Sequence, residues 1–235
     1  MTKINELSVF LPTYNEEKNI KEVVDNTKSV LENVAEKWEL IVVDDGSIDQ
    51  TGQIVSKLAE SEKRIKLITH KKNLGYGATL ADGFYNSKYD WVAFTDSDGQ
   101  FNFAEIDKFI EKQNETGADI VIGYYKKRRV SKFKILTSRL WEFTVFILFG
   151  LKVHDIDCGF KLIKKEVIDK IPRLESQRGA FISSELLIKA GKKGFKFAEV
   201  PVTHYPRTKG SGTGRNINVI IKSFADLFRL WGKLR

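Results

Sequence analysis

The sequence predicts an α/β fold in which helices flank a mostly parallel central sheet. Short apolar runs typical of strands alternate with segments whose apolar residues recur at helical spacing through the first half of the chain. Polar loops rich in acidic residues follow several of these runs, as expected at the carboxyl edge of a parallel sheet. The chain has 235 residues, 42% of them hydrophobic, with no internal repeat or low-complexity linker, so we expect one domain.

The expected elements follow one another as strand and helix. A strand at 7–11, a helix over 20–34 and a strand at 40–43 form a first βαβ unit. The elements expected after it are a helix at 54–59, a strand at 65–69, a helix at 77–87, and strands at 91–95, 119–122 and 195–202. After residue 122 the alternation that predicts a parallel sheet breaks into a basic loop and an aromatic-rich segment.

Asp96-Ser97-Asp98 directly follows the apolar run at 91–95, so a buried strand delivers two carboxylates to the edge of the sheet. Carboxylates at positions i and i+2 can jointly hold a divalent cation that keeps open positions for substrate phosphates. A nucleoside-diphosphate substrate fits that arrangement. Asp98-Gly99 is also an ordinary turn sequence, so the neighbouring loops must distinguish the two interpretations.

Two further polar loops, at 12–16 and 44–47, should reach the same crevice. Asp44 and Asp45 can accept hydrogen bonds from a base and a ribose, whereas Ser47, Asp49 and Thr51 are expected to cap the next helix. The loop at 73–77 suits a phosphate, yet its glycines also permit tight helix packing. Neither a P-loop nor a Gly-x-Gly-x-x-Gly sequence occurs, which disfavours an ATPase or a dehydrogenase.

The positive charge of the chain, formally +8, is concentrated in two segments. Residues 124–139 contain seven Lys or Arg and no acid, and residues 204–235 contain seven against one Asp. This distribution indicates a localised anionic partner, either a phosphate or an anionic membrane face. Arg128 and Arg129 are the leading phosphate candidates because an arginine fork binds phosphate bidentately. A nucleic-acid module is disfavoured, since no RNP, KH or zinc pattern occurs.

Two apolar stripes, at 140–151 and 217–234, lie beside this positive charge. Core packing explains such stripes, but interfacial helices have the same composition, and we expect at least one stripe to touch lipid or a small membrane subunit. The longest uncharged apolar stretch, 143–151, is shorter than the roughly twenty residues of a spanning helix. The single cysteine, Cys158, excludes a disulfide framework and favours a reducing compartment. We therefore expect a peripheral protein on the cytosolic membrane face.

Several motifs in order resemble one family. They are Leu11-Pro12-Thr13-Tyr14-Asn15-Glu16, Val43-Asp44-Asp45-Gly46-Ser47, Asn73-Leu74-Gly75-Tyr76-Gly77-Ala78, Asp96-Ser97-Asp98-Gly99-Gln100, Asp157-Cys158-Gly159-Phe160-Lys161, and Glu199-Val200-Pro201-Val202 followed by Arg207. The chain resembles the inverting family 2 glycosyltransferases of GT-A fold, particularly dolichyl- or polyprenyl-phosphate sugar synthases of the dolichol-phosphate-mannose synthase type. The resemblance implies a catalytic domain at 1–212, with a nucleotide-sugar half at 5–123 and an acceptor half at 124–212. An amphipathic helix at 213–235 would follow.

The resemblance also implies roles for individual residues. The nucleotide-sugar pocket would be lined by Pro12, Tyr14, Glu16, Asp44, Asp45 and Asp96. Asp96, Asp98 and Gln100 would surround a Mg²⁺ or Mn²⁺ ion, and Asp96, Asp98 and Arg207 would serve catalysis. The acceptor phosphate would be met by Arg128, Arg129, Arg139 and Lys209, and the sugar by Asp155, Asp157 and Glu185. Asp98 and Glu185 are the candidate bases, and His204 is a structural residue or a third metal ligand.

The expected reaction moves a hexose from GDP-mannose or UDP-glucose to a polyprenyl or dolichyl phosphate. The cation stabilises charge on the departing diphosphate, and a phosphate monoester with a second pKa of about 6 needs no strong base. Attack from the opposite face predicts inversion. A transferase acting on a glycan hydroxyl is the alternative, whereas a processive polysaccharide synthase is disfavoured because Gln177-Arg178-Gly179 departs from its Gln-x-x-Arg-Trp motif.

Overall fold

The computed structural model describes residues 3–125, 132–176, 179, 181–207, 209 and 217–234, with side chains described except at 132–137 and 217–222. Its centre is a seven-stranded sheet in the order β3-β2-β1-β4-β6-β5-β7. The strands are β1 (Ile4–Thr13), β2 (Ala35–Asp44), β3 (Ile65–Thr69), β4 (Trp91–Phe94), β5 (Ile120–Tyr125), β6 (Lys161–Lys164) and β7 (Phe197–Val202). The helices are α1 (Ile20–Val34), α2 (Thr51–Ser61), α3 (Tyr76–Asn86), α4 (Ile106–Thr116), α5 (Lys132–Phe149), α6 (Lys165–Lys170), α7 (Phe181–Lys192) and α8 (Ile217–Leu234), with a 3₁₀ turn η1 (Phe103–Glu105) before α4.

The sheet is parallel except at β6. β1 pairs in parallel with β2 and β4, β2 with β3, and β5 with β7, whereas β6 runs antiparallel between β4 and β5. The mostly parallel α/β fold predicted from the sequence is therefore confirmed. The sequence prediction missed β6 and α6, because a four-residue strand that begins and ends with lysine lacks the apolar alternation of a longer strand.

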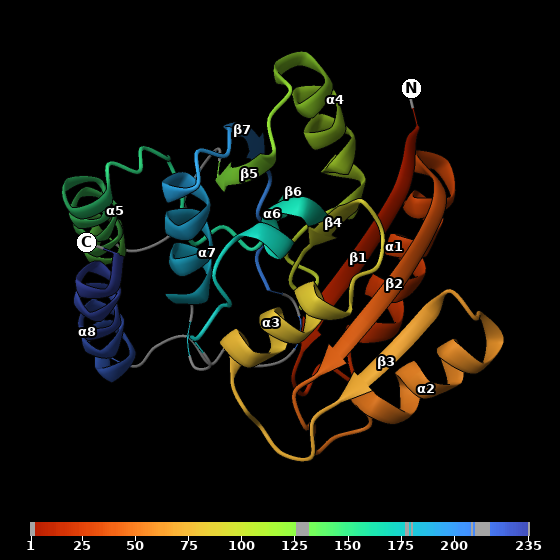
Figure 1. Cartoon of the computed structure of the whole chain (residues 1–235). Helices are drawn as coiled ribbons and strands as arrows, with labels where there is room; N and C mark the ends of the chain where they lie inside the picture. Colours follow the sequence, from red (N-terminus) through yellow and green to blue (C-terminus); the bar gives the residue numbers. More distant parts are fainter. Residues whose placement is uncertain are drawn as a thin grey trace.

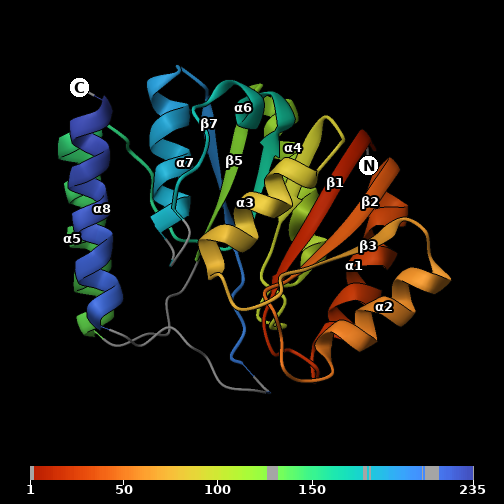
Figure 2. The same cartoon turned by 60° about the horizontal axis from the view of Figure 1, so that its bottom comes forward.

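Helices cover both faces of the sheet (Figures 1 and 2). Because side chains alternate across a strand, Phe10 faces one core and Val9 and Leu11 face the other. Residues of α3, α7 and α8 pack into the core that contains Phe10, and residues of α1, α2 and α4 pack into the opposite core. Both cores are closed, so substrates must bind at the edge of the sheet, where the loops emerge.

α5 and α8 lie side by side beyond α7, at the edge of the molecule near β7 (Figures 1 and 2). The Trp141 ring on α5 meets Phe224 on α8 edge-on, with centroids 5.0 Å apart, and Leu227 and Leu230 of α8 are buried. This part of the α8 stripe thus packs into the core, as in ordinary amphipathic helices, whereas Phe228 of the same stripe is exposed. In the described residues, no helix is both long enough and apolar enough to cross a bilayer.

α3 packs against β1 at a glycine. The Phe10 ring lies 4.9 Å from Phe84 and 5.3 Å from Phe94, centroid to centroid, and it also covers Gly83. A Cβ atom at position 83 would stand 2.2 Å from the Phe10 ring. No side chain fits there without moving the helix or the ring, so this contact sets how closely α3 approaches the sheet.

We predict that Gly83→Ala destabilises the protein by about 1–3 kcal/mol, the usual cost of overpacking a closed core. Denaturant unfolding measures the change. Gly232→Ala on α8 is the matched control, because its added methyl group meets no atom within 4 Å and alanine favours the helix. Equal stability changes in the two variants would contradict the packing argument.

Candidate functional site

The loops after β1, β2 and β4 meet at one edge of the sheet, as the sequence predicts. Thr13 at the end of β1 pairs with Asp44 at the end of β2, and Phe10 of β1 pairs with Phe94 at the end of β4. The chain runs outward from β1 to β2 and β3, and β4 then returns to the other side of β1. Ligands of open α/β sheets bind at such a reversal of strand order.

Hydrogen bonds hold the first two loops together. Asp44 accepts from the Ser47 amide at 3.0 Å and from its hydroxyl, and the Ser47 oxygen accepts from the Asn15 amide at 2.8 Å. The Asn15 side chain in turn accepts from the Ile48 amide at 2.9 Å. This network fixes the 12–16 loop, with Tyr14, against the 44–48 loop, and it engages one oxygen of the buried Asp44.

The N-cap residue of α2 is Gln50, which makes no side-chain capping bond, and of the three expected residues only Asp49 binds an amide at the start of the helix. Asp49 accepts from the Thr51 amide at 3.0 Å. The Thr51 hydroxyl oxygen instead accepts from the Glu16 amide at 2.8 Å, and the Ser47 hydroxyl binds the loop after β1. The capping prediction was therefore wrong for Ser47 and Thr51, because tertiary partners in the neighbouring loop take the hydroxyl groups.

Asp45 binds the protein's own backbone. Its carboxylate accepts from the amides of Leu74 and Gly75, each at 2.8 Å, and contacts Nδ1 of His70 at 2.7 Å. Gly75 has a φ of 102°, a conformation that glycine adopts without steric cost. Asp45 thus shapes the loop at the start of α3, and the contact with base or ribose that the sequence predicted for it remains a prediction.

Asp96 lies at the end of β4 in a closely packed position. Its Oδ1 accepts from the Tyr76 hydroxyl at 3.0 Å, and a Cβ atom at position 159 would stand 2.4 Å from its Oδ2, so only glycine fits there. Burial and the neighbouring charge of Asp98 raise the pKa of Asp96 to about 7. The carboxylate therefore lacks a sufficient positive counter-charge among its protein neighbours.

Asp98 joins this group through Arg207. It accepts from the Gln100 amide at 3.0 Å, and its Oδ2 lies 3.3 Å from the Arg207 guanidinium. The same guanidinium donates to Glu16. Burial and the charge of Asp98 raise the pKa of Glu16, and the hydrogen bonds from Asn19 and Arg207 lower it. The net pKa is above the ordinary value of a glutamate. Arg207 therefore links the loop after β1 to the loop after β4. We call Glu16, Asp96 and Asp98 the acid cluster.

The acid cluster fits a divalent cation bound together with a substrate. Asp96 and Asp98 provide hard oxygen ligands, and the raised pKa of Asp96 shows that a further positive charge would be accommodated. In the described part of the chain, no group of three or more His, Cys, Asp or Glu side chains converges as a complete metal site. Substrate phosphates would therefore supply the remaining ligands, as Mg²⁺ sites commonly require.

The segment after β7 closes one side of the acid cluster. The Gln100 side-chain amide donates to the Tyr205 carbonyl at 2.9 Å, which ties the β4 loop to this segment. The His204 ring packs 5.2 Å from Phe101 and 4.8 Å from Tyr125, and burial lowers its pKa. This packing supports the structural interpretation of His204.

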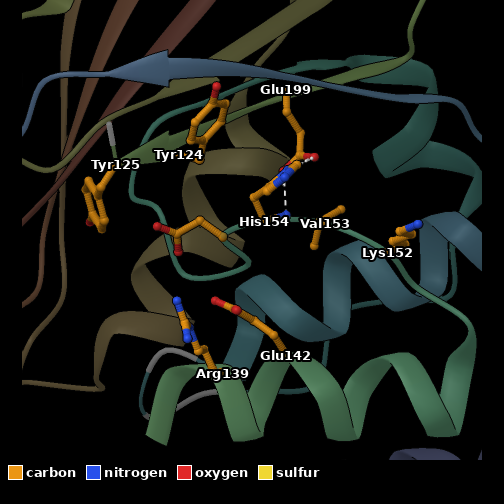
Figure 3. A pocket seen from close by; sticks show the side chains of 9 residues that line it. Tyr124, Tyr125, Arg139, Glu142, Lys152, Val153, His154 and Glu199 are labelled. Carbon is orange, nitrogen blue, oxygen red and sulfur yellow. Dashed lines mark hydrogen bonds and ion pairs between the residues drawn. The ribbon is translucent and has the colours of Figure 1, made fainter. Parts of the chain in front are cut away.

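The structure also contains a cavity of about 800 Å³ (Figure 3). Its walls come from β5, α5, the 152–155 loop and β7, through Tyr124, Tyr125, Arg139, Glu142, Lys152, Val153, His154, Asp155 and Glu199. Tyr125 connects the two sites, because its ring lines the cavity and packs on His204. Burial, with the negative charges that include Asp96 and Asp155, raises its pKa. The cavity can therefore place a second substrate next to a nucleotide at the acid cluster.

The structure separates the residues that the sequence assigned to the acceptor and the sugar. Arg139 and the buried Asp155 line the cavity, and Asp157 is exposed in the same turn. Lys209 instead lies near α1, 3.7 Å from Glu22. Arg128 and Arg129 lie outside the described residues.

The structure does not support the role of base or sugar ligand that the sequence predicted for Glu185. It is buried on α7, where its two oxygens accept from the amides of Glu175 and Ser176 at 2.9 Å and one also pairs with Lys189 at 2.6 Å. A carboxylate so fully engaged by its own chain is not available as a base or as a sugar ligand. It orders the segment before α7 instead.

Sequence reasoning missed the pair formed by His154 and Glu199. The Glu199 carboxylate accepts from the His154 amide at 2.7 Å and lies 2.8 Å from its Nδ1. The signal in the sequence was an acidic residue in the middle of the strand at 197–202, where an apolar side chain is usual. The partner lies 45 residues away, so periodicity could not identify it.

Comparisons with known proteins agree with this geometry. Residues 8–172 match the sequence profile of glycosyl transferase family 2. The chain is 30% identical to dolichyl-phosphate beta-glucosyltransferase ALG5A of Trichomonas vaginalis, over 95% of this chain and 72% of that protein. It is 28% identical to undecaprenyl-phosphate 4-deoxy-4-formamido-L-arabinose transferase of Salmonella choleraesuis, over 88% of this chain and 62% of that protein. The chain thus spans only part of the length of these relatives.

Solved structures share the fold. Glucosyl-3-phosphoglycerate synthase of Mycobacterium tuberculosis, in complex with Mn²⁺, UDP and glucosyl-3-phosphoglycerate, superimposes with a TM-score of 0.71 at 21% identity, over 97% of this chain and 80% of that one. Mannosyl-3-phosphoglycerate synthase of Rubrobacter xylanophilus gives a TM-score of 0.72 at 18% identity, over 98% and 76%. The GT-A-like fold predicted from the sequence is therefore confirmed.

We predict that the stability contributed by His70 depends on pH. Burial by itself would lower the pKa of His70, but the hydrogen bonds with Asp45 and Asp82 raise the pKa by a larger amount. The net pKa is therefore above the ordinary value of histidine. The charged ring therefore stabilises the fold fully below about pH 6.5, and this contribution is lost as the pH rises through the raised pKa. His70→Gln should cost more unfolding free energy at acidic than at alkaline pH, measured by urea denaturation.

Asp82→Asn is the matched variant, because it weakens one of the two partners of His70 and retains Asp45. It should show the same trend with pH at smaller amplitude. A stability loss in His70→Gln that is equal at all pH values would contradict the prediction.

Proposed function

Since the chain belongs to glycosyl transferase family 2 and is therefore a glycosyltransferase, we propose that it transfers glucose from UDP-glucose to a polyprenyl or dolichyl phosphate, with inversion. The observation that carries the proposal is the cavity that holds Arg139 next to the acid cluster at the carboxyl edge of the sheet. This arrangement provides one site for a nucleoside diphosphate and another for a second anion. GDP-mannose is the alternative donor.

The donor site uses the loops after β1, β2 and β4. Pro12, Tyr14 and Asp44 border the nucleotide, and the diphosphate lies toward Asp96 and Asp98. A Mg²⁺ or Mn²⁺ ion held by these two carboxylates would neutralise the charge that develops on the diphosphate when the sugar bond breaks. Two dolichyl-phosphate beta-glucosyltransferases of Trichomonas vaginalis, at 30% and 32% identity, support glucose as the transferred sugar.

The protein's own residues position these groups. Tyr76 and Gly159 fix the Asp96 carboxylate, and Arg207 brings a permanent positive charge to Asp98 and Glu16. A diphosphate that displaces Glu16 from Arg207 would gain a bidentate partner. Arg207 would thereby stabilise the same leaving group.

The acceptor phosphate binds in the cavity at Arg139. A phosphate monoester has a second pKa of about 6, so its attacking oxygen is largely ionised near neutral pH. No general base is then required, in agreement with the full internal pairing of Glu185. Attack on the face opposite the diphosphate gives a β-linked product from an α-linked donor.

The outer face of α5 supports a lipid acceptor. Trp141 and Val145 face the core, whereas Leu140, Phe143 and Ile147 on the far side of the same helix are 55–62% exposed. A helix that is apolar on both sides needs a cover for its outer face. We propose that this face lies on the cytosolic membrane surface, where the lipid acceptor resides.

A transfer assay tests the function. The protein is incubated with labelled UDP-glucose or GDP-mannose and with either polyprenyl phosphate or a water-soluble glycan, in Mn²⁺ or in chelator. We expect metal-dependent transfer of glucose to polyprenyl phosphate. Equal transfer to the soluble glycan would contradict the lipid-phosphate acceptor and favour a hydroxyl acceptor.

We predict that Asp98→Asn lowers kcat by about 100-fold or more, because the cation that would offset the charge of the leaving group loses a charged oxygen ligand. The matched control is Asp90→Asn. Asp90 precedes β4 at the opposite end of the strand, so its loss should leave activity within about twofold. Comparable losses in both variants would contradict the site assignment.

A further inference from the structure

His154 is held in the cavity wall by Glu199 through two hydrogen bonds. One Glu199 oxygen accepts from the His154 backbone amide at 2.7 Å, and the other lies 2.8 Å from Nδ1 of the ring (Figure 3). The Tyr124 ring lies against the imidazole with its centroid 5.4 Å away. The ring thus has a fixed position and orientation although it belongs to a loop.

These contacts determine the state of the second ring nitrogen. A carboxylate only accepts hydrogen bonds, so Nδ1 carries the proton that faces Glu199. Nε2 is then a bare acceptor in the neutral ring and a donor in the protonated ring. The His154 side chain is 76% exposed, and Nε2 has no hydrogen-bond partner among the described residues.

Two cations, Arg139 and Lys152, and three carboxylates, Glu142, Asp155 and Glu199, line the cavity around His154. Figure 3 shows Arg139 and Glu142 projecting from α5 toward the loop and strand that carry His154 and Glu199. Lys152 and Asp155 belong to the same loop as His154, and Tyr124 and Tyr125 come from β5. Since the Glu199 charge is engaged by His154 itself, a protonated imidazole adds a cation to Arg139 and Lys152.

We propose that His154, oriented by Glu199, is a specificity-determining residue that donates a hydrogen bond from Nε2 to the phosphate of the acceptor. The ligand class is a phosphate monoester, met by Arg139 from α5 and by His154 from the loop. This proposal rests on the proposed function, whose acceptor it describes in more detail.

The alternative role for a carboxylate-bound histidine is a general base, which would suit a hydroxyl acceptor. The cations Arg139 and Lys152 on the cavity wall favour the phosphate instead, since a neutral hydroxyl needs neither. The two roles differ in kinetics. A phosphate-binding histidine changes KM for the acceptor, whereas a base changes kcat.

The test uses the full chain with farnesyl phosphate and, as the uncharged counterpart, farnesol. Binding is measured by calorimetry, and KM and kcat by the labelled-sugar assay. His154→Asn keeps an amide donor near the position of Nδ1 and removes Nε2. Glu199→Gln keeps the shape of the partner and removes its charge.

We expect His154→Asn to weaken farnesyl phosphate binding roughly tenfold, because the phosphate loses a charge-assisted hydrogen bond. The kcat value should stay within about twofold, and farnesol binding should not change. Glu199→Gln should weaken farnesyl phosphate binding in the same direction, since the imidazole loses the charged partner that orients it.

Three results would overturn the proposal. They are unchanged binding of farnesyl phosphate in His154→Asn, a fall in kcat at constant KM, and an equal loss of farnesol binding. If the wild-type protein binds no farnesyl phosphate, the proposed function itself fails. Binding of the phosphate that is indifferent to His154 would instead refute only this inference.

Discussion

The site depends on the repulsion between the carboxylates of Asp96 and Asp98, which are separated by a single residue at the end of a buried strand. Asp96 is confined by Tyr76 and Gly159, and its pKa of about 7 records both its burial and the charge of Asp98. Such an arrangement costs stability in the free protein and is maintained because it binds positive charge. Arg207 supplies part of that charge, and a cation bound with the donor would supply the rest.

The sheet brings the other parts of the site to this point. The reversal of strand order at β1 gathers three loops, and the segment that leads into the antiparallel β6 brings Gly159 to the side of Asp96. Beyond Tyr125, β5 and β7 form one wall of the cavity and α5 forms another. In the proposed function, donor and acceptor would thus approach from different sides, as an inverting displacement requires. The exposed outer face of α5 would then place the lipid on the acceptor side.

Much of this architecture followed from the sequence because its causes are local. Apolar periodicity located β1, α1, β2 and β4, and the carboxyl ends of parallel strands necessarily share an edge. The other contacts of the site depend on residues that are brought together only by the tertiary structure. The bonds of Asp45 with the backbone near Gly75, of Glu185 with the amides of Glu175 and Ser176, and of His154 with Glu199 join residues that no periodic pattern relates. Composition also could not show which apolar side chains are buried: Leu227 and Leu230 of α8 lie in the core and Phe228 is exposed, whereas α5 exposes Leu140, Phe143 and Ile147 on its outer face.

The most direct test of the central claim is Mn²⁺ affinity in the presence of UDP, measured by paramagnetic titration in the wild type and in Gly159→Ala. The added methyl group would stand 2.4 Å from Asp96 Oδ2, so the carboxylate must move. The account predicts roughly tenfold or greater loss of Mn²⁺ affinity, the usual effect of disturbing a residue that positions a metal ligand, with the fold retained. Unchanged Mn²⁺ affinity would show that the geometry of Asp96 does not hold the ion, and would contradict the account.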